Sequence, residues 1–309
     1  MVARKKITIV GAGRVGSTAA QLCAMKELGD IVLWNRTAGT AKGLALDIQE
    51  MAPIEGFDVR ITGTDNWKDT KDSDVVVVTA GLPRQPGMSR DDLLLKNAAI
   101  IKEACLNVKK YSPDCILIVI TNPLDAMVWY AKKVTGFPRN RVIGMAGILD
   151  TARFRSFVAM HLNVSVESVE AMVLGGHGDF MVPLPDHSTV VGAPLTKVLD
   201  KKTLNKLIER TRNGGAEILE LEKNSSAFFA PGSAVTQMVE AIIKDKHEIL
   251  PCAAYLEGEY GLNGIFMGVP CKLGAKGMEK VIELNLSRQE ERELKKSAES
   301  VRELISKLK

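Results

Sequence analysis

The sequence predicts an α/β protein whose first half forms a doubly wound parallel sheet. Short runs rich in β-branched residues alternate with longer segments of helical period over roughly the first 144 residues. Several of these runs are almost wholly apolar, which is typical of strands covered on both faces. Parallel neighbours need crossover connections, which the helical segments supply. After Gly144 the rhythm changes, and we expect an α+β domain with antiparallel strands.

In the first domain, residues 1–144, short strands are expected to alternate with longer helices. The expected strands are Ile7–Val10, Ile31–Trp34, Val59–Thr62, Val75–Thr79, Ile116–Ile120 and Val142–Gly144. The helices between them are expected at Val15–Leu28, Thr40–Met51, Ser89–Lys110 and Leu124–Val134. Their lengths suit crossovers on both faces of a sheet.

In the second domain, residues 145–309, longer helices are mixed with shorter strands. Helices are expected at Leu149–Leu162, Lys202–Leu221 and Ser233–Lys244. Strands are expected at Val169–Leu174, Thr189–Val191, Tyr255–Gly258, Ile265–Pro270 and Gly277–Glu283. The last helix opens with a capping box, Ser287 and Glu290. A buried apolar stripe follows at Leu294, Ala298, Val301, Leu304, Ile305 and Leu308. No repeat or flexible linker separates the domains, so one packing unit is expected.

The amino-acid composition indicates a globular protein and argues against several other classes. Hydrophobic residues at 46% and charged residues at 25% are typical of globular chains and exclude disorder. Aromatic residues are only 5%, and the net charge of +4 comes from scattered basic residues, so no nucleic-acid partner is expected. No apolar run approaches the roughly 18 residues that a membrane span needs.

The cysteines and the N-terminus indicate a cytoplasmic protein. The five cysteines form an odd set without a C-x-x-C pair, and we expect buried thiols in a reducing compartment. They are Cys23, Cys105, Cys115, Cys252 and Cys271. Basic residues precede Ile7–Val10 as in a signal peptide, but Gly11 interrupts the apolar run at once. No Cys/His spacing typical of a metal site occurs, so none is expected.

The first strand runs directly into a glycine-rich loop that opens a helix. Gly11 suits a tight turn, Gly13 suits close approach to a pyrophosphate, and Gly16 suits close helix–strand packing. The strand–loop–helix context is the one that a dinucleotide-binding (Rossmann) fingerprint requires. The predicted loop comprises Gly11, Ala12, Gly13, Arg14, Val15 and Gly16.

The end of the second strand departs from that fingerprint. An acidic residue commonly binds the adenosine ribose there, whereas this chain has Asn35 followed by Arg36. Neutral Asn35 would not repel a 2′-phosphate, and Arg36 could donate hydrogen bonds to it. One hypothesis is therefore that NADP is accepted or even preferred. The alternative is that NAD is held through Asn35, with Arg36 as a surface residue.

Five residues of the remaining loops and helices are candidates for chemistry. Arg84 and Arg90 belong to a loop at the carboxyl end of the sheet, where ligands bind in open α/β folds. Asp150 and Arg153 share one helix face. His177 is flanked by glycines that leave room for a substrate. Taken singly, each has an ordinary alternative: a solvated arginine, a surface ion pair or a structural histidine.

Three segments in order give a specific resemblance. Thr121–Met127, Gly144–Arg153 and Gly175–Asp179 resemble signatures of the lactate/malate dehydrogenase family, in particular of its lactate-dehydrogenase-like malate dehydrogenase branch. The resemblance extends over essentially the whole chain. It implies oxidation and reduction of a 2-hydroxy acid with NAD or NADP.

The resemblance also implies residue roles. His177 would be the acid/base and Asp150 its orienting partner, while Arg153 would bind the substrate C1 carboxylate and Arg90 would polarise the reacting carbonyl. Asn122 would contact both substrate and cofactor, with a cis bond to Pro123. Further cofactor contacts are implied at Asn97, Ile120 and Thr121.

Arg84 bears on which acid is used. The resemblance places Gln at this position in the family's lactate dehydrogenases, whose substrate has a methyl group there, whereas Arg84 can pair with a second carboxylate. Malate and oxaloacetate are therefore the expected substrates. Another 2-hydroxy acid such as lactate, or a non-catalytic dinucleotide-binding protein, are the alternatives. A homotetramer built as a dimer of dimers is expected by analogy.

Overall fold

A nine-stranded sheet organises the molecule in the computed structural model, which describes residues 4–83, 89–223 and 225–308. Its strand order is β14-β13-β12-β6-β5-β4-β1-β2-β3. The six strands of the first half pair in parallel, as predicted. They are β1 (Lys6–Val10), β2 (Asp30–Trp34), β3 (Ile61–Thr64), β4 (Val75–Val78), β5 (Ile116–Val119) and β6 (Val142–Gly144). The order reverses between β1 and β4, so the carboxyl ends of these strands flank a crevice.

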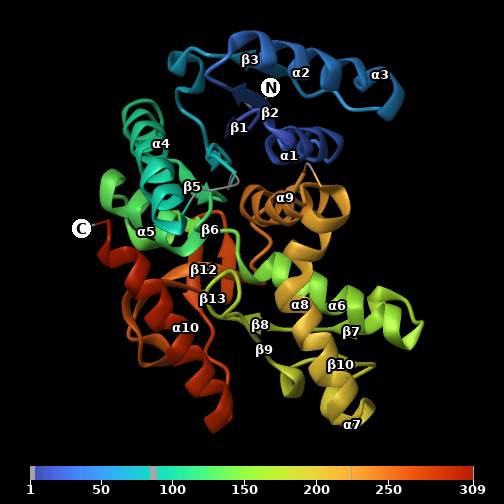
Figure 1. Cartoon of the computed structure of the whole chain (residues 1–309). Coiled ribbons are helices and arrows are strands. Elements are labelled where there is room, and N and C mark those ends of the chain that lie inside the picture. The colour runs from blue at the N-terminus through green and yellow to red at the C-terminus, as the bar shows by residue number, and fades with distance from the viewer. Residues whose placement is uncertain (1–3, 84–88, 224, 309) are drawn as a thin grey trace.

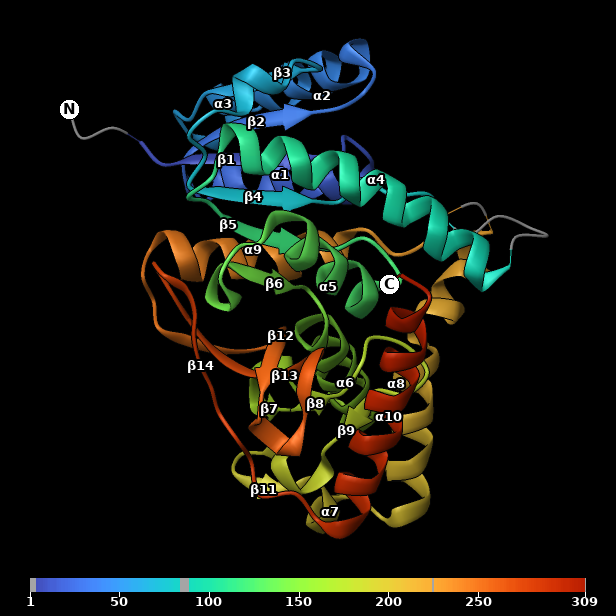
Figure 2. The same cartoon turned by 90° about the vertical axis from the view of Figure 1, so that its left-hand side faces the viewer.

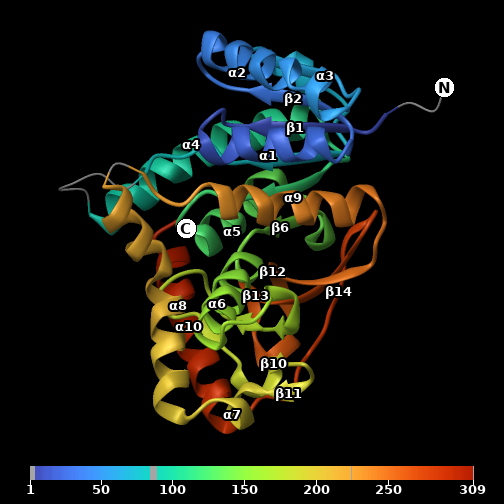
Figure 3. The same ribbon diagram turned by 90° about the vertical axis from the view of Figure 1, so that its right-hand side faces the viewer.

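Helices cover both faces of this sheet (Figures 1 and 2). On one face lie α1 (Arg14–Met25) and α2 (Ala38–Glu50), followed by the short α3 (Ala52–Glu55). The other face carries α4 (Arg90–Tyr111) and α5 (Leu124–Thr135). Figure 3 shows α9 (Phe229–Ile243), from the second half of the chain, lying beside α1. The doubly wound architecture is therefore confirmed.

The antiparallel strands extend this same sheet instead of forming a separate one. They are β12 (Glu248–Glu257), β13 (Asn263–Gly274) and β14 (Gly277–Val281). They join at β6, where Ala253 pairs with Gly144. A β-carbon at Gly144 would lie 3.0 Å from the Ala253 side chain, so the glycine permits this approach. β12 starts seven residues before the predicted strand (255 − 248), because its Pro251, Ala253 and Ala254 lack the β-branched signal.

The rest of the second half packs below this sheet around three helices. These are α6 (Gly147–Leu162), α8 (Lys201–Glu222) and α10 (Arg288–Ser306). Figures 2 and 3 show α8 and α10 side by side, and Arg212 of α8 pairs with Glu293 of α10. The predicted capping box of α10 is present, and its apolar stripe is buried except for the half-buried Leu304.

One expected strand is wrong: residues 169–174 are two short strands. They are β7 (Val169–Glu170), which pairs with β10 (Thr189–Val190), and β8 (Val173–Leu174), which pairs with β9 (Val182–Pro183). β10 also pairs with β11 (Ala193–Pro194), which precedes the short α7 (Leu195–Val198). The break arises because the Met172 amide donates to the Ser188 hydroxyl at 3.1 Å and not to a strand.

Short 3₁₀ turns complete the chain. They are η1 (Trp67–Thr70), η2 (Arg139–Arg141), η3 (Val166–Ser168), η4 (Pro185–His187) and η5 (Glu259–Gly261).

α9 begins four residues before its predicted start (233 − 229). Pro231 lies in its first turn, where a missing amide hydrogen costs no helical bond. No helix among the described residues is long and apolar enough to cross a membrane.

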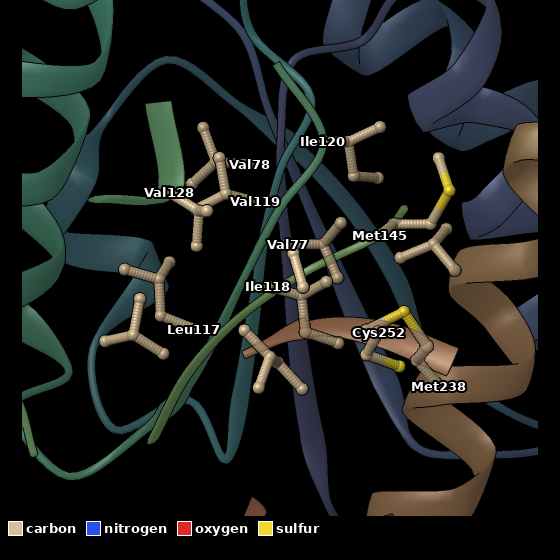
Figure 4. Packing of buried hydrophobic residues seen from close by; sticks show 14 of the residues in the cluster. Val77, Val78, Leu117, Ile118, Val119, Ile120, Val128, Met145, Met238 and Cys252 are labelled. Atoms are coloured by element: carbon tan, nitrogen blue, oxygen red, sulfur yellow. The ribbon is translucent and has the colours of Figure 1, made fainter. Parts of the chain in front are cut away.

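One buried apolar cluster runs through both halves of the chain. Side chains of β5 alternate between the two faces of the sheet, as Figure 4 shows. Val119 lies with Val128 of α5, whereas Ile118 points toward Met238 of α9. A smaller cluster forms between α6 and α8 around Phe154. All five cysteines are buried free thiols, as predicted.

Candidate active site

The glycine loop between β1 and α1 has the geometry that its sequence predicts. Gly11 adopts a φ of +115°, and a β-carbon there would lie 2.6 Å from Thr79 Oγ1. A β-carbon at Gly16 would collide with the Gly11 carbonyl. Around Gly13, by contrast, no described atom lies within 4 Å of the β-carbon position. Two glycines thus pack the loop tightly, and the third leaves open space above it.

The start of α1 faces this open space without a side-chain cap. Gly13 is the N-cap residue, and Ser17 is the first residue whose amide bonds back to it, at 2.9 Å. The amides of Arg14, Val15 and Gly16 therefore precede the first helical bond. Such amides, together with the positive end of the helix dipole, bind anionic groups such as a diphosphate. The loop fits the predicted dinucleotide.

A pocket of about 350 Å³ lies beside the loop. It is formed where β1, β2 and β4 end, closed on one side by α4. Trp34 and Trp67 line it with stacked rings whose centroids are 4.0 Å apart. The other lining residues are Val10, Gly11, Gly13, Asn35, Arg36, Thr37, Thr79, Ala80, Gly81, Leu82, Ile100, Glu103 and Ala104. We refer to this cavity as the dinucleotide pocket.

Asn35 and Arg36 both line the dinucleotide pocket, as the sequence analysis expects. Asn35 Oδ1 lies 3.5 Å from the Ala12 amide, and Asn35 Nδ2 lies 3.4 Å from the Thr37 carbonyl. Arg36 Nη2 lies 3.7 Å from Glu103 Oε2 of α4. The sequence analysis missed Glu103. Helical period places it on one face with Ile100 and Ala104, but it does not show that this face meets the pocket.

Asn97, Thr121 and Asn122 tie together the loops beneath the pocket. Asn97 Oδ1 accepts from the Leu82 amide at 2.8 Å, while its Nδ2 donates to the Asn122 carbonyl at 2.7 Å. Thr121 donates to the Ala80 carbonyl at 2.7 Å. The Asn122–Pro123 bond is cis, as expected. Ile120 is buried at the end of β5. These contacts hold the chain after β4 against the chain after β5.

His177, Asp150 and Arg153 come together as one hydrogen-bonded group. Asp150 Oδ2 lies 2.9 Å from His177 Nδ1, and Asp150 Oδ1 accepts from Arg153 Nη1 at 3.3 Å. Asp150 and Arg153 share one face of α6 because they are three residues apart. His177 follows β8, where Gly175 at a φ of +93° turns the chain. Asp150 is 2% exposed, while His177 and Arg153 keep 15% and 14%.

This arrangement suits acid/base chemistry. Burial, the largest effect, lowers the pKa of His177, but the charge and hydrogen bond of Asp150 and the charge of Asp125 outweigh it, so the net shift is upward. Nδ1 is bound to Asp150, which leaves Nε2 as the nitrogen that can exchange a proton with a ligand. Arg153 beside it offers a planar donor to a carboxylate.

The remaining predicted arginines are only partly described. Arg84 lies outside the described residues. Arg90 begins α4, and the helix is capped by Ser89 and Asp92, which bond to each other's amides. The side chain of Arg90 also lies outside the description. Their predicted roles stay predictions.

Four residues that support the site were missed in the sequence analysis. Asp125 of α5 and Ser297 of α10 bond the backbone of the His177 loop. Gly214 and Gly215 of α8 face Arg153; a β-carbon on Gly214 would lie 3.2 Å from its Cδ. The adjacent glycines inside a long helical pattern were the available signal, because glycine there usually has a packing reason.

A possible metal-ligand set lies elsewhere on the surface. Asp245, His247 and Glu279 bring their donor atoms within 4.8 Å of one another, and all three are exposed. Glu279 already pairs with Lys272 at 3.0 Å and with His247 at 3.1 Å. These are ordinary contacts of a solvated ion-pair cluster.

Comparisons with known proteins agree along the chain. A family model described as the NAD-binding domain of lactate/malate dehydrogenase matches residues 5–144, and its alpha/beta C-terminal domain matches 148–309. A malate dehydrogenase of Roseiflexus castenholzii is 54% identical over 306 residues, covering 99% of each chain. The crystal structure of Cryptosporidium parvum malate dehydrogenase superposes with a TM-score of 0.96 at 43% identity, covering 99% of both chains. The lactate dehydrogenase of the same organism, complexed with lactic acid and nicotinamide adenine dinucleotide, has a TM-score of 0.96 at 38% identity, covering 99% and 98%.

Proposed function

The chain belongs to the lactate/malate dehydrogenase family, and we propose that within it the chain is a malate dehydrogenase. It interconverts (S)-malate and oxaloacetate with a nicotinamide dinucleotide. The observation that carries this proposal is the bonded group of His177, Asp150 and Arg153. A catalytically silent relative has no need to keep a histidine, its carboxylate partner and an adjoining guanidinium together and open to a ligand.

The acid/base role belongs to His177. When malate is oxidised, Nε2 takes the hydroxyl proton; when oxaloacetate is reduced, Nε2 returns it to the carbonyl oxygen. Asp150 holds the ring through Nδ1 and stabilises the cation that forms. A bound dinucleotide would supply the hydride chemistry, as acceptor from the substrate carbon in oxidation and as donor to it in reduction. Because His177 must be protonated for reduction, reduction slows as the pH rises past the pKa of His177.

Three arginines and Asn122 bind the substrate in this proposal. Arg153 binds the C1 carboxylate in a bidentate contact, and its pairing with Asp150 fixes its direction. Arg90 polarises the reacting carbonyl, and Asn122 contacts both substrate and dinucleotide. Arg84 pairs with the second carboxylate, the group that distinguishes oxaloacetate from pyruvate. The residues holding the dinucleotide are those of the glycine loop with Asn35, Arg36, Asn97, Ile120, Thr121 and Asn122.

Replacing Arg84 by Gln tests the choice of substrate. A carboxylate that loses its cation in a closed site is strongly disfavoured, so R84Q is expected to lower kcat/KM for oxaloacetate by about a hundredfold or more. Turnover of pyruvate should rise in the same variant. The measurement is consumption of the reduced cofactor with each keto acid, with H177Q as the inactive control. If the parent enzyme prefers pyruvate, the activity is that of a lactate dehydrogenase. If R84Q keeps the parent's ratio of kcat/KM for oxaloacetate to kcat/KM for pyruvate, Arg84 does not select the substrate.

For the cofactor, we propose that NADP is accepted beside NAD. Asn35 places no negative charge at the ribose, and Arg36 is 75% exposed and able to turn toward a 2′-phosphate. The opposing feature is Glu103, whose carboxylate pairs with Arg36. Parallel measurement of kcat/KM for NADH and NADPH with oxaloacetate tests the proposal. No measurable turnover with NADPH would refute it.

The wider assignments are also proposals. A homotetramer, a dimer of dimers, follows by analogy with the family, and a monomer mass by light scattering would overturn it. A cytoplasmic location is supported by five buried cysteines that remain thiols. The division into a dinucleotide-binding domain, 1–144, and a substrate domain, 145–309, is supported by the strand pairing, because β6 pairs in parallel with β5 but antiparallel with β12.

A further inference from the structure

Two consecutive amides of the catalytic loop are held by side chains from two helices. The Gly176 amide donates to Ser297 Oγ of α10 at 2.8 Å. The His177 amide donates to Asp125 Oδ2 of α5, also at 2.8 Å. A β-carbon at Gly176 would lie 2.9 Å from Val301 Cγ2 and 3.2 Å from Asp125 Oδ2. The backbone of this loop is therefore packed closely against α5 and α10.

A buried carboxylate, that of Asp125, accepts the hydrogen bond from the His177 amide. It is 4% exposed, and among the described residues nothing donates a hydrogen bond to its Oδ1. Burying a carboxylate is much more costly than burying a hydroxyl, and Ser297 shows that a hydroxyl suffices to accept an amide of this loop. The negative charge of Asp125 thus calls for a reason beyond the hydrogen bond.

The charges around His177 supply that reason. α6 contributes Asp150 and Arg153, and α5 contributes Asp125. At the loop α10 contributes the neutral Ser297 and Val301, while its Lys296 lies over the Phe180 ring, 5.4 Å from the centroid. Without Asp125, the described charges acting on the ring would be one carboxylate and one guanidinium, which oppose each other.

We propose that Asp125 is a positioning residue for His177, which holds the His177 backbone through one oxygen and favours the cationic imidazole through its charge. The proposal rests on the proposed function, because the cation is the proton donor in oxaloacetate reduction. It adds a second carboxylate to the one contributed by Asp150. The two act differently: Asp150 orients the ring, and Asp125 fixes the backbone from which the ring extends.

The titration of Asp125 itself limits this effect to neutral and alkaline pH. Burial raises the pKa of Asp125 to about 6, although the His177 amide and charge act in the opposite direction. Above that pH the carboxylate is ionised and stabilises the imidazolium. Below it the carboxyl group is neutral and contributes only the hydrogen bond.

Asp125→Asn separates charge from geometry. The amide oxygen of Asn can still accept from the His177 backbone, while the charge is gone. Ser297→Ala is the matched control, because it removes the neighbouring amide contact without changing any charge. The first readout is NMR titration of ¹³C-labelled histidine rings in the free protein. The chain has four histidines, and the His177 signal is assigned by its loss in H177Q.

We expect D125N to lower the titration midpoint of His177 by about half to one pH unit, whereas S297A leaves it in place. The second readout is the pH dependence of kcat/KM for oxaloacetate reduction. The pH at which this rate declines on the alkaline side should be lower by a similar amount in D125N, and unchanged in S297A. An unmoved NMR midpoint in D125N overturns the proposal. So does an equal shift in S297A, because the loop geometry would then be the cause. If the parent protein showed no turnover of oxaloacetate while D125N still lowered the His177 midpoint, the positioning role of Asp125 would be supported and the dehydrogenase assignment refuted.

Discussion

Glu103 is the residue most directly placed to influence the choice of cofactor. Its carboxylate lies 3.7 Å from Arg36 at the edge of the dinucleotide pocket, and both side chains are more than half exposed. An exposed pair of this kind contributes little to stability. Its charge, however, opposes a 2′-phosphate and engages the arginine that would bind one.

Glu103→Gln is therefore expected to favour NADPH. The variant should raise kcat/KM for NADPH by about three- to tenfold and leave kcat/KM for NADH almost unchanged, because only the phosphate is charged at that position. Glu50→Gln, an exposed change of the same charge on α2, is the control. An unchanged ratio of the two cofactors would show that Glu103 does not act on the 2′ position.

The residue scale also shows which parts of the site can be predicted from sequence. Asp150 and Arg153 are three apart on one helix, so their shared face follows from the helical period alone. Their meeting with His177, and the contact of His177 with Asp125, join positions 27 and 52 residues apart. Motif resemblance supplied the first of these contacts. Nothing in local spacing indicated the second, because burial of a single carboxylate depends on the tertiary packing of α5 against the loop.

At the scale of the element, α8 contains residues of low helix propensity in its interior. It runs for 22 residues with Gly214 and Gly215 in its interior, each costing about 1 kcal/mol relative to Ala. Both face Arg153 of α6. The period of the sequence predicts the helix correctly despite the glycines, but it does not predict that Arg153 packs against them.

Gly214→Ala and Gly215→Ala are expected to behave differently. Both should gain up to about 1 kcal/mol of helix propensity. At Gly214 the new methyl lies 3.2 Å from Arg153 Cδ and displaces the guanidinium, which should raise KM for oxaloacetate roughly tenfold. At Gly215 the distance to Nη2 is 3.5 Å, an ordinary contact, so KM should change much less. Steady-state kinetics and urea unfolding of both variants test this; equal KM values would exclude the steric explanation.

At the scale of the whole molecule, the doubly wound half and the single packing unit were predictable, whereas the strand pairing that joins the two halves was not. Continuous apolar runs such as Val75–Val78 indicate strands covered on both faces, and their alternation with helices implies parallel pairing. The junction rests on the single pairing of Ala253 with Gly144, two small residues with weak strand preference. Sequence patterns report local periodicity, whereas this contact depends on the close approach of two backbones.

A second junction between the halves, from α1 to α9, includes an ion-pair cluster that is sensitive to acid. Glu240 of α9 accepts from Lys26, the C-cap residue of α1, at 2.7 Å and from Lys244 at 3.1 Å. The hydrogen bond from Lys26, with that from Lys244 and both charges, lowers the pKa of Glu240 from 4.5 to about 2, although its burial opposes this. Because the folded-state pKa lies below the unfolded one, the stabilisation is present above about pH 4.5 and is lost as the pH falls toward 2.

Glu240→Gln is accordingly expected to lower the free energy of unfolding by about 1 kcal/mol at pH 7. The difference from the parent should shrink as the pH falls from about 4.5 toward 2, since the parent glutamate is then increasingly protonated as well. Urea unfolding at pH 7 and pH 3 measures it, with Glu220→Gln, an exposed change on α8, as the control. A loss of equal size at both pH values would mean that Glu240 joins α1 and α9 through packing and not through its charge.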